Sequence, residues 1–290
     1  MNQQQQKWLY LTILAIVWGT SFILMKKSLD GLTPVQLGAL RILITAVFLL
    51  LIGFKSLKKI EKRHWKFVAI TALLSTFFPM FLFAFALTGI ESYISAILNS
   101  FTPFNTLIFG ALVFGLGFKK KQLFGIIIGL IGAVILILNG AKLNPDQNYW
   151  YAIFVILASI GYAFNANIIK KYLHDLNALA ITTGNFLLLI VPASIVLYFS
   201  DLHVDFEWDE KTQWAFGYVT ILAVVGTGIA KVIFNRLIQI SSPVFSASVT
   251  YLIPIVAVVW GLIDGEKLSF IQLLAGGVIL FGVYLVNKAK

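Results

Sequence analysis

The chain has 290 residues, of which 59% are hydrophobic and only 12% are charged, and its formal net charge is +10. A soluble domain carries about 25% charged residues, so this composition excludes a water-soluble globular protein and indicates that lipid covers most of the surface. Cysteine is absent, which excludes disulfides, thiol nucleophiles and thiolate metal sites.

Long apolar stretches follow one another along the chain, each of the length that crosses a hydrocarbon layer of roughly 30 Å, about 20 helical residues. They are too long for barrel strands and lack their alternating pattern, and backbone groups in lipid must be hydrogen-bonded internally, so helices are expected. The sequence predicts an all-α membrane protein with ten transmembrane helices, over residues 8–25, 34–53, 67–87, 92–116, 122–138, 149–169, 178–199, 214–235, 243–263 and 268–286.

The basic residues are distributed unevenly between the loops. If the N-terminus is cytoplasmic, 15 of the 22 Lys and Arg residues lie in cytoplasmic segments and five in outer loops, while Arg41 and Lys231 fall inside spans. This bias follows the positive-inside rule and predicts that both termini are cytoplasmic. The positive charge therefore reflects topology, and we expect no nucleic-acid partner.

The two halves of the chain can be aligned with each other. Matching positions, at offsets of 144 to 151 residues, include Trp18 with Tyr162, Lys26 with Lys170, and Pro103 with Pro254. Each half has five predicted spans, an odd number, so the second half enters the membrane from the opposite side. We therefore expect two inverted five-helix repeats, residues 1–143 and 144–290, a recurrent plan of secondary transporters.

Short motifs recur near the start and the end of this pattern. They are Trp18-Gly19-Thr20-Ser21-Phe22, with Arg41 in the next span, and later Tyr251-Leu252-Ile253-Pro254 and Gly265-Glu266-Lys267-Leu268. Together they resemble the drug/metabolite transporter superfamily, EamA branch, over the whole chain. The resemblance implies ten helices, a central cavity lined by the third, fourth, eighth and ninth, and export or exchange of small metabolites, often amino acids.

The chain departs from this family pattern at one point. The acid that usually follows the fourth helix of a repeat is Glu266 in the second half, whereas Gly115 or Leu116 stands there in the first. A role that needs a symmetric pair of acids is therefore not supported.

Two cations lie inside predicted spans, where a charge is costly and is a functional candidate by default. Arg41 either contacts substrate or has a structural role, bonding helix-end carbonyls or snorkelling outward. Lys231 either snorkels near a helix end or pairs with a substrate carboxylate or phosphate. Because the histidines, His64 among them, are expected in loops, and the acids in loops or, for Asp264 and Glu266, at a helix end, proton coupling would have to use Lys231, and otherwise transport is uncoupled.

Polar side chains gather around a proline in the fourth and ninth spans. Proline frees a carbonyl and bends a helix, and matched breaks in corresponding helices indicate a midplane site. Alternatively, Ser, Thr and Asn only bond across helices, for about 1 kcal/mol each. The predicted helix breaks are Pro103 and Pro254, and the predicted substrate-binding residues are Lys231, Asn99, Thr102, Asn105, Ser246, Thr250, Tyr251, Arg41 and Trp18, with Asn165 and Asn185 as further candidates.

The predicted spans lack the groups that intramembrane catalysis needs. Without His, Cys, Asp or Glu, neither a metal cluster nor a Ser–His pair can be built there, so we expect no enzyme, no metal and no cofactor. We expect a secondary transporter working by alternating access. Two cations without an anion favour anionic or zwitterionic solutes, amino acids first. A sugar-phosphate or nucleotide-sugar exchanger, a channel and a lipid flippase remain alternatives.

Small-residue faces occur in the fifth and tenth predicted spans, at Gly125, Gly129 and Gly132 and at Gly276, Gly277 and Gly282. Such faces pack helices closely, within one chain or between two copies, so a homodimer is left open. A short chain without a sorting signal suits a prokaryotic plasma membrane, with the lipid bilayer as its surroundings and a small molecule as its substrate.

Overall fold

The computed structural model describes residues 2–115, 120–143, 147–200, 202 and 209–288, and in this part of the chain the protein is helical, without β-strands. The elements of the N-terminal half are α1 (Gln3–Ser28), α2 (Pro34–Gly53), η1 (Phe54–Lys59), α3 (Lys62–Ala72), η2 (Leu73–Phe77), α4 (Phe78–Ala86), α5 (Ser92–Asn99), α6 (Thr102–Phe114) and α7 (Lys120–Leu143). Those of the C-terminal half are η3 (Tyr149–Tyr151), α8 (Ala152–Tyr172), α9 (Ala178–Tyr198), α10 (Glu210–Ala223), η4 (Val224–Ile229), α11 (Ala230–Ile240), α12 (Pro243–Ala247), η5 (Ser248–Tyr251), α13 (Ile253–Ile263) and α14 (Phe270–Lys288).

Eight helical segments of the described residues are long and apolar enough to cross a membrane: Gln3–Ser28, Pro34–Lys59, Lys62–Ala86, Ser92–Phe114, Tyr149–Tyr172, Ala178–Tyr198, Glu210–Ile240 and Pro243–Ile263. They coincide with the first four predicted spans and with the sixth to the ninth. The remaining two predicted spans fall on α7 and α14, where the apolar segments are shorter, Leu123–Leu136 and Phe270–Gly282. The count of ten therefore stays a prediction.

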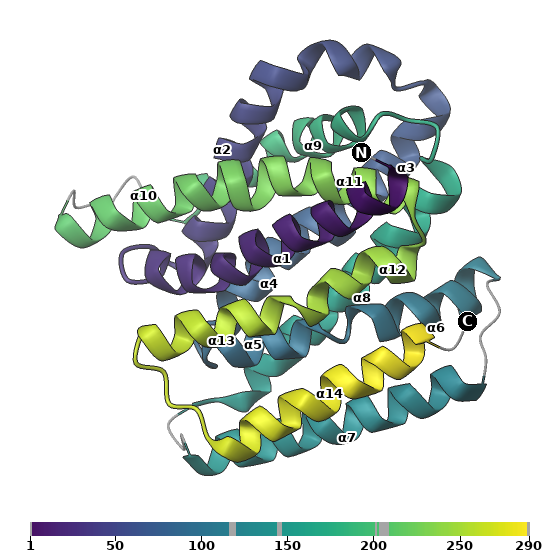
Figure 1. Cartoon of the computed structure of the whole chain (residues 1–290). Helices are drawn as coiled ribbons and strands as arrows, with labels where there is room; N and C mark the ends of the chain where they lie inside the picture. The colour runs from purple at the N-terminus through teal and green to yellow at the C-terminus, as the bar shows by residue number, and fades with distance from the viewer. Residues whose placement is uncertain (1, 116–119, 144–146, 201, 203–208, 289–290) are drawn as a thin grey trace.

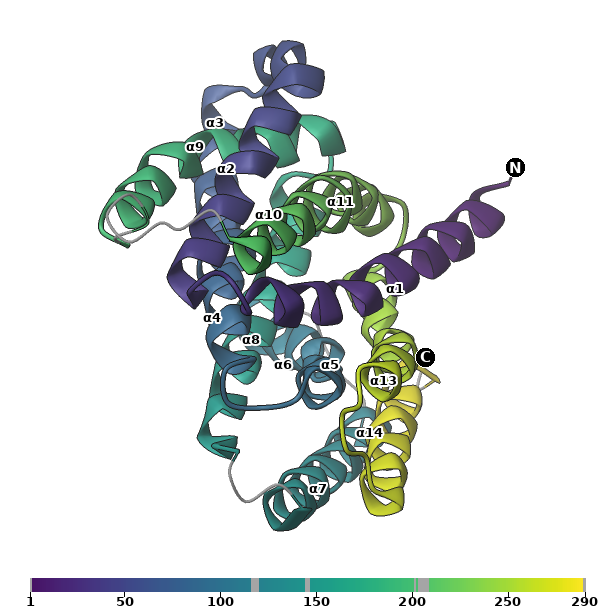
Figure 2. The same cartoon turned by 90° about the vertical axis from the view of Figure 1, so that its left-hand side faces the viewer.

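The helices of the two halves interleave. In both views α7 and α14 lie side by side at one edge of the molecule, while α2, α3 and α9 gather at the opposite edge (Figures 1 and 2). Helix α1 contacts α10, α11 and α13, just as α8 contacts α3, α4 and α6, and α2 packs on α9. Each of these contacts thus has a counterpart with the halves exchanged.

Helices α7 and α14 pack through their small-residue faces. A Cβ added to Gly282 would lie 2.5 Å from the carbonyl oxygen of Gly125, and one added to Gly132 would lie 2.8 Å from Ile279. Only glycine permits this approach of the two backbones. Gly125, Gly129 and Gly132 of the predicted face on α7 therefore lie at a contact with α14, which contributes Gly282. Gly276 faces Ile97 and Gly277 faces open space, so they do not take part in it. The homodimer stays a prediction.

Four of the membrane segments are interrupted. The third and eighth contain π-helical turns, η2 and η4. The fourth breaks between α5 and α6, and the ninth passes through the 3₁₀ turn η5. Pro103 and Pro254 lie in the first turns of α6 and α13, where the missing N–H leaves no intrahelical bond unmade.

One expectation about a loop residue is wrong. His64 lies in the first turn of α3 and is only 3% exposed, because α3 begins at Lys62, several residues before the predicted span. Its Nε2 lies 3.4 Å from the Asp175 carboxylate.

Candidate functional site

A cavity of about 90 Å³ lies among the interrupted helices and α1, α2 and α8. It has room for several water molecules or a small solute. The third, fourth, eighth and ninth membrane segments all contribute to its wall, as do the first, second and sixth. Of the predicted substrate-binding residues, six line the cavity, namely Trp18, Arg41, Asn99, Thr102, Lys231 and Thr250, and so does the further candidate Asn165.

The other three predicted residues are not part of the cavity wall. The Asn105 side-chain amide donates to Ser159 Oγ at 2.7 Å. The Ser246 hydroxyl lies 2.8 Å from Ser241 Oγ and donates to the Ser242 carbonyl at 3.1 Å. Tyr251, at the end of η5, is half-buried outside the cavity wall. Asn105 thus connects α6 to α8, which is the alternative that the sequence left open for these polar groups, whereas Ser246 bonds to residues at the junction of α11 and α12. Asn185 also lies outside the wall and donates to Thr71 Oγ1 at 3.0 Å.

The π turn η2 holds Lys231. The Lys231 ammonium donates to the Ser75 carbonyl at 2.8 Å, to the Ser75 hydroxyl at 3.0 Å and to the Thr76 hydroxyl. Pro79, four residues after Ser75, has no N–H with which to occupy that carbonyl. The turn thereby presents several acceptors on one side, and a lysine from the other half of the chain fills them.

The π turn η4 holds Arg41 and Trp18 in the same manner. Arg41 Nε donates to the Thr227 hydroxyl at 2.7 Å, and Trp18 Nε1 donates to the Gly226 carbonyl at 3.0 Å. Arg41 Nη1 also contacts Met25 Sδ at 3.3 Å. Both cavity cations are therefore fixed by π turns, a feature that often marks functional sites.

Most of the remaining wall residues are apolar, and none of the described lining residues carries a negative charge. Among its residues, all of them within the described part of the chain, none is Asp or Glu. The main apolar contributors are Phe22, Met25, Met80, Phe83 and Phe234. Arg41 and Lys231 lie within electrostatic reach of each other, so the cavity has a positive potential that no lining acid neutralises. An anionic group is the partner that this arrangement lacks.

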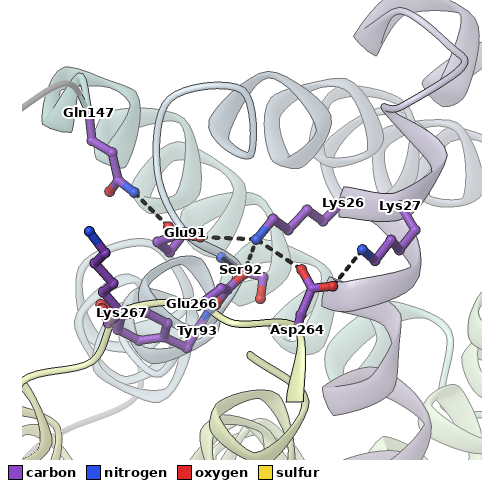
Figure 3. A network of polar contacts seen from close by, with 9 residues as sticks. All are labelled: Lys26, Lys27, Glu91, Ser92, Tyr93, Gln147, Asp264, Glu266 and Lys267. Carbon is purple, nitrogen blue, oxygen red and sulfur yellow. Dashed lines mark hydrogen bonds and ion pairs between the residues drawn. The ribbon is translucent and has the colours of Figure 1, made fainter. Parts of the chain in front are cut away.

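Five charged side chains cluster at the end of the bundle where α1 ends, and we call them the Lys26 cluster: Lys26, Lys27, Glu91, Asp264 and Glu266 (Figure 3). Lys26 Nζ lies 2.7 Å from Glu266, 3.1 Å from Glu91 and 3.1 Å from Asp264. Lys27 Nζ lies 2.5 Å from the second oxygen of Asp264. The cluster joins the end of α1 to the start of α5 and the end of α13, next to Met25 of the cavity wall.

Backbone geometry brings the two C-terminal acids to one lysine. Gly265, between Asp264 and Glu266, has φ +81°, a left-handed conformation that ends α13 and favours glycine. The Glu266 side chain, 1% exposed, also accepts from the backbone N–H groups of Ser92 and Tyr93 at 3.1 and 3.4 Å. It thus satisfies free donors at the N-terminus of α5, where a negative charge is favourable.

The cluster shifts the pKa values of Glu91 and Asp264 in opposite directions. Burial, and then the negative charge of Glu266, raise the pKa of Glu91 above its ordinary 4.5. Burial pushes the pKa of Asp264 upward as well, but its hydrogen bonds and ion pairs with Lys27 and Lys26 outweigh this and lower it below 3.8. Glu91 is therefore the acid of this pair that takes up a proton more readily than usual.

The corresponding lysine of the second half has different partners. Lys170, near the end of α8, donates to the backbone carbonyls of Gln239 at 3.1 Å and Ser241 at 2.6 Å. We call this the Lys170 contact. Gly115 ends α6 with φ +72°, as Gly265 ends α13, but the next residue, Leu116, lies outside the described residues. The Lys170 contact thus consists of one cation and the carbonyls at a helix end.

The sequence-based prediction did not include several polar groups near the cavity. It did not identify the hydroxyls of Ser75, Thr76 and Thr227, because a π turn leaves no fixed motif. Pro79 and the Gly226-x-Gly228 pair were the available signals. It also placed the acids of the Lys26 cluster separately, Glu91 in a loop and Asp264 and Glu266 at a helix end, although they meet only through tertiary structure.

Comparisons with known proteins agree with this architecture. A model of the EamA-like transporter family matches residues 6–138 and again 149–288. The inner membrane transporter YedA of Escherichia coli is 29% identical over 97% of this chain and 90% of its own length. A probable amino-acid metabolite efflux pump of the same species is 25% identical, covering 94% and 92%. The transporter YoaV of Bacillus subtilis is 24% identical, covering 91% and 90%.

A solved crystal structure has the same fold. It superposes with a TM-score of 0.69 over 99% of this chain and 98% of the other, at 14% sequence identity. With the two family matches and the membrane-spanning helices, these similarities give one conclusion: the chain is a multi-pass membrane protein that belongs to the EamA-like transporter family.

Proposed function

We propose that this protein is a secondary exporter of small carboxylate-bearing metabolites, amino acids foremost, and that it is not an enzyme. One observation carries the proposal. A cavity among the interrupted helices contains Arg41 and Lys231, and none of the described residues that line it is an acid. A carboxylate that enters it gains two favourable interactions at low dielectric. Such a cavity would repel a cationic dye, which needs a carboxylate to bind.

Alternating access between two inverted five-helix repeats, residues 1–143 and 144–290, would move the solute. The paired contacts of α1 and α8 with the opposite half support this arrangement. So do the interruptions, which fall in the third and fourth segments and again in the eighth and ninth. Two halves of similar structure can rock against each other about a central site.

In this scheme both termini are cytoplasmic, in the plasma membrane of a prokaryote. The end of the bundle with the Lys26 cluster then faces outward, and the end with the Lys170 contact faces the cytoplasm. The bias of basic residues supports this orientation. The name of the Escherichia coli relative, an amino-acid metabolite efflux pump, supports the direction and the substrate class.

The proposal can be tested with purified protein in liposomes. Radiolabelled amino acids, sugar phosphates and a cationic dye are each offered to wild type and to Arg41→Met. We expect exchange of at least one amino acid by wild type and a loss of about tenfold or more in the variant, since the hydrogen bond to a charged group is removed. Transport of the dye without any amino acid would refute the substrate class.

A further inference from the structure

The two cavity cations differ in what they have left to offer a substrate. An ammonium has three N–H groups, and Lys231 already has three acceptors, two on Ser75 and one on Thr76. A substrate could bond Lys231 directly only by displacing one of them. Lys231 therefore contributes positive charge and holds the π turn η2 in place.

Arg41, in contrast, has free donors. A guanidinium has five N–H groups, of which Nε bonds Thr227 and one on Nη1 contacts Met25. The other three have no hydrogen-bond partner among the described residues. The side chain lines the cavity, and a guanidinium with free donors suits two-point binding of a carboxylate. The carboxylate end of a substrate therefore belongs at Arg41.

A second unpartnered polar group lies on α8. Asn165 is only 3% exposed, lines the cavity, and has no hydrogen bond to any other residue of the described chain. Burying an amide without a partner costs about 1–3 kcal/mol, so a ligand or water must take up its bonding capacity. Nearby in the wall, Asn99 Oδ1 accepts from Thr102 at 3.2 Å and keeps one lone pair.

Arg41 and Asn165 line the same small cavity, so both lie where a small zwitterion would bind. Tyr162 lies within electrostatic reach of Arg41, and Asn165 is three residues farther along the same helix. Positions three apart share a helix face and differ by about 4.5 Å in height. The ammonium and carboxylate of an α-amino acid sit on one carbon, so one hydrogen bond at each end spans such a distance. The apolar wall at Phe22, Met80 and Phe83 would receive the side chain.

We infer that the cavity recognises the two charged ends of an α-amino acid at separate places, the carboxylate at Arg41 and the ammonium at the side-chain oxygen of Asn165. The inference rests on the proposed function and deepens it. Asn165 is then the residue that lets the cavity bind an amino acid more tightly than the same acid without its amino group. Because the described wall residues include no carboxylate, an amide oxygen accepts from the ammonium without giving the cavity an affinity for simple cations.

Three probes with one side chain test this assignment: L-leucine, 4-methylpentanoate, which lacks the amino group, and 3-methylbutylamine, which lacks the carboxylate. Binding to protein in nanodiscs is measured from the rise in melting temperature with probe concentration. For wild type we expect L-leucine to bind about tenfold more tightly than 4-methylpentanoate, and the amine not to bind.

Two substitutions at Asn165 sharpen the test, with one control. Asn165→Leu should weaken L-leucine about tenfold to the level of 4-methylpentanoate, whose affinity stays unchanged. Asn165→Asp should weaken the acid and let the amine bind, a gain that a merely damaged protein cannot show. The matched control is Asn105→Leu, an asparagine outside the cavity wall, which should keep the preference for L-leucine.

The outcomes separate this inference from the proposed function. If wild type binds L-leucine and 4-methylpentanoate equally tightly, or if Asn165→Leu keeps their ratio, the role of Asn165 is refuted while a carboxylate carrier remains. If neither carboxylate binds wild type and no amino acid is exchanged in liposomes, the proposed function fails and this inference fails with it.

Discussion

Lys26 and Lys170 occupy corresponding positions near the ends of α1 and α8, yet they hold their ends of the molecule together by different chemistry. Lys26 faces three carboxylates, and Lys27 shares one of them. Lys170 faces two backbone carbonyls. The first set of contacts depends on ionised groups, and the second depends on one cation and fixed dipoles.

This difference gives the two ends unequal strength and unequal sensitivity to conditions. In the Lys26 cluster the acids are 1% to 18% exposed and the lysine 32%, so the ion pairs are partly shielded from water and salt. The carbonyls that Lys170 contacts lie at the end of α11. Water can hydrogen-bond to them once the lysine moves away. We therefore expect the Lys26 end to open at a greater cost than the Lys170 end.

Replacing each lysine should produce the largest measurable difference between the two ends. The chain has no cysteine, so Ser21→Cys gives a single reporter in the cavity wall for a membrane-impermeant maleimide. In Lys26→Met three carboxylates lose their common cation, at about 2 kcal/mol, and with the orientation proposed above, labelling from the outer face should rise about 30-fold. In Lys170→Met, labelling from the cytoplasmic face should rise only about threefold.

Equal increases for the two lysine variants would show that the ion pairs add nothing to closure at the Lys26 end. The control for both is Lys171→Met in the same reporter, since Lys171 lies beside Lys170 but packs over the rings of Phe114 and Tyr172. It should leave labelling from either face close to that of the reporter alone.

Replacing one acid at a time should change labelling less than replacing Lys26 does. The change should be an increase for Glu266 and a decrease for Glu91. Glu266→Gln can still accept from Ser92 but loses its charge toward Lys26, so labelling from the outer face should rise about tenfold. Glu91→Gln removes repulsion against Glu266 and should lower labelling about twofold. If both variants change labelling in the same direction, Glu91 and Glu266 do not compete for Lys26.

The sequence predicted the elements of the fold better than the contacts between them. Apolar length alone predicted the eight long helical segments, because a long apolar segment in lipid satisfies its own backbone hydrogen bonds by forming a helix. Arg41, Lys231 and the residues around Pro103 were found because polar groups at membrane depth are rare. The Lys26 cluster was missed, since its residues lie up to 240 positions apart and only folding brings them together. The free amide of Asn165 and the saturated ammonium of Lys231 depend on side-chain positions that no spacing encodes.

The smallest expected effect is a dependence on outer pH. The pKa of Glu91 is raised above 4.5 in the closed cluster by burial and by Glu266, whereas an open end would return it to that ordinary value. A proton then binds the closed state more tightly, so closure gains as pH falls through the raised pKa, and the gain is complete below 4.5 and lost at higher pH. Asp264 has the opposite effect on closure, because its pKa is lowered in the closed cluster. Its contribution to closure is therefore lost only as pH falls below 3.8.

Between neutral pH and about 4.5 Glu91 should therefore control the response, and labelling of the reporter from the outer face should slow, by less than the change expected for Glu91→Gln, after correction for the reactivity of the thiol. Glu91→Gln should remove this dependence while Lys170→Met keeps it, because the Lys170 contact contains no acid. A response of the same size in Glu91→Gln would place the sensitive group elsewhere, and labelling that accelerates in acid would mean that the proton favours the open end.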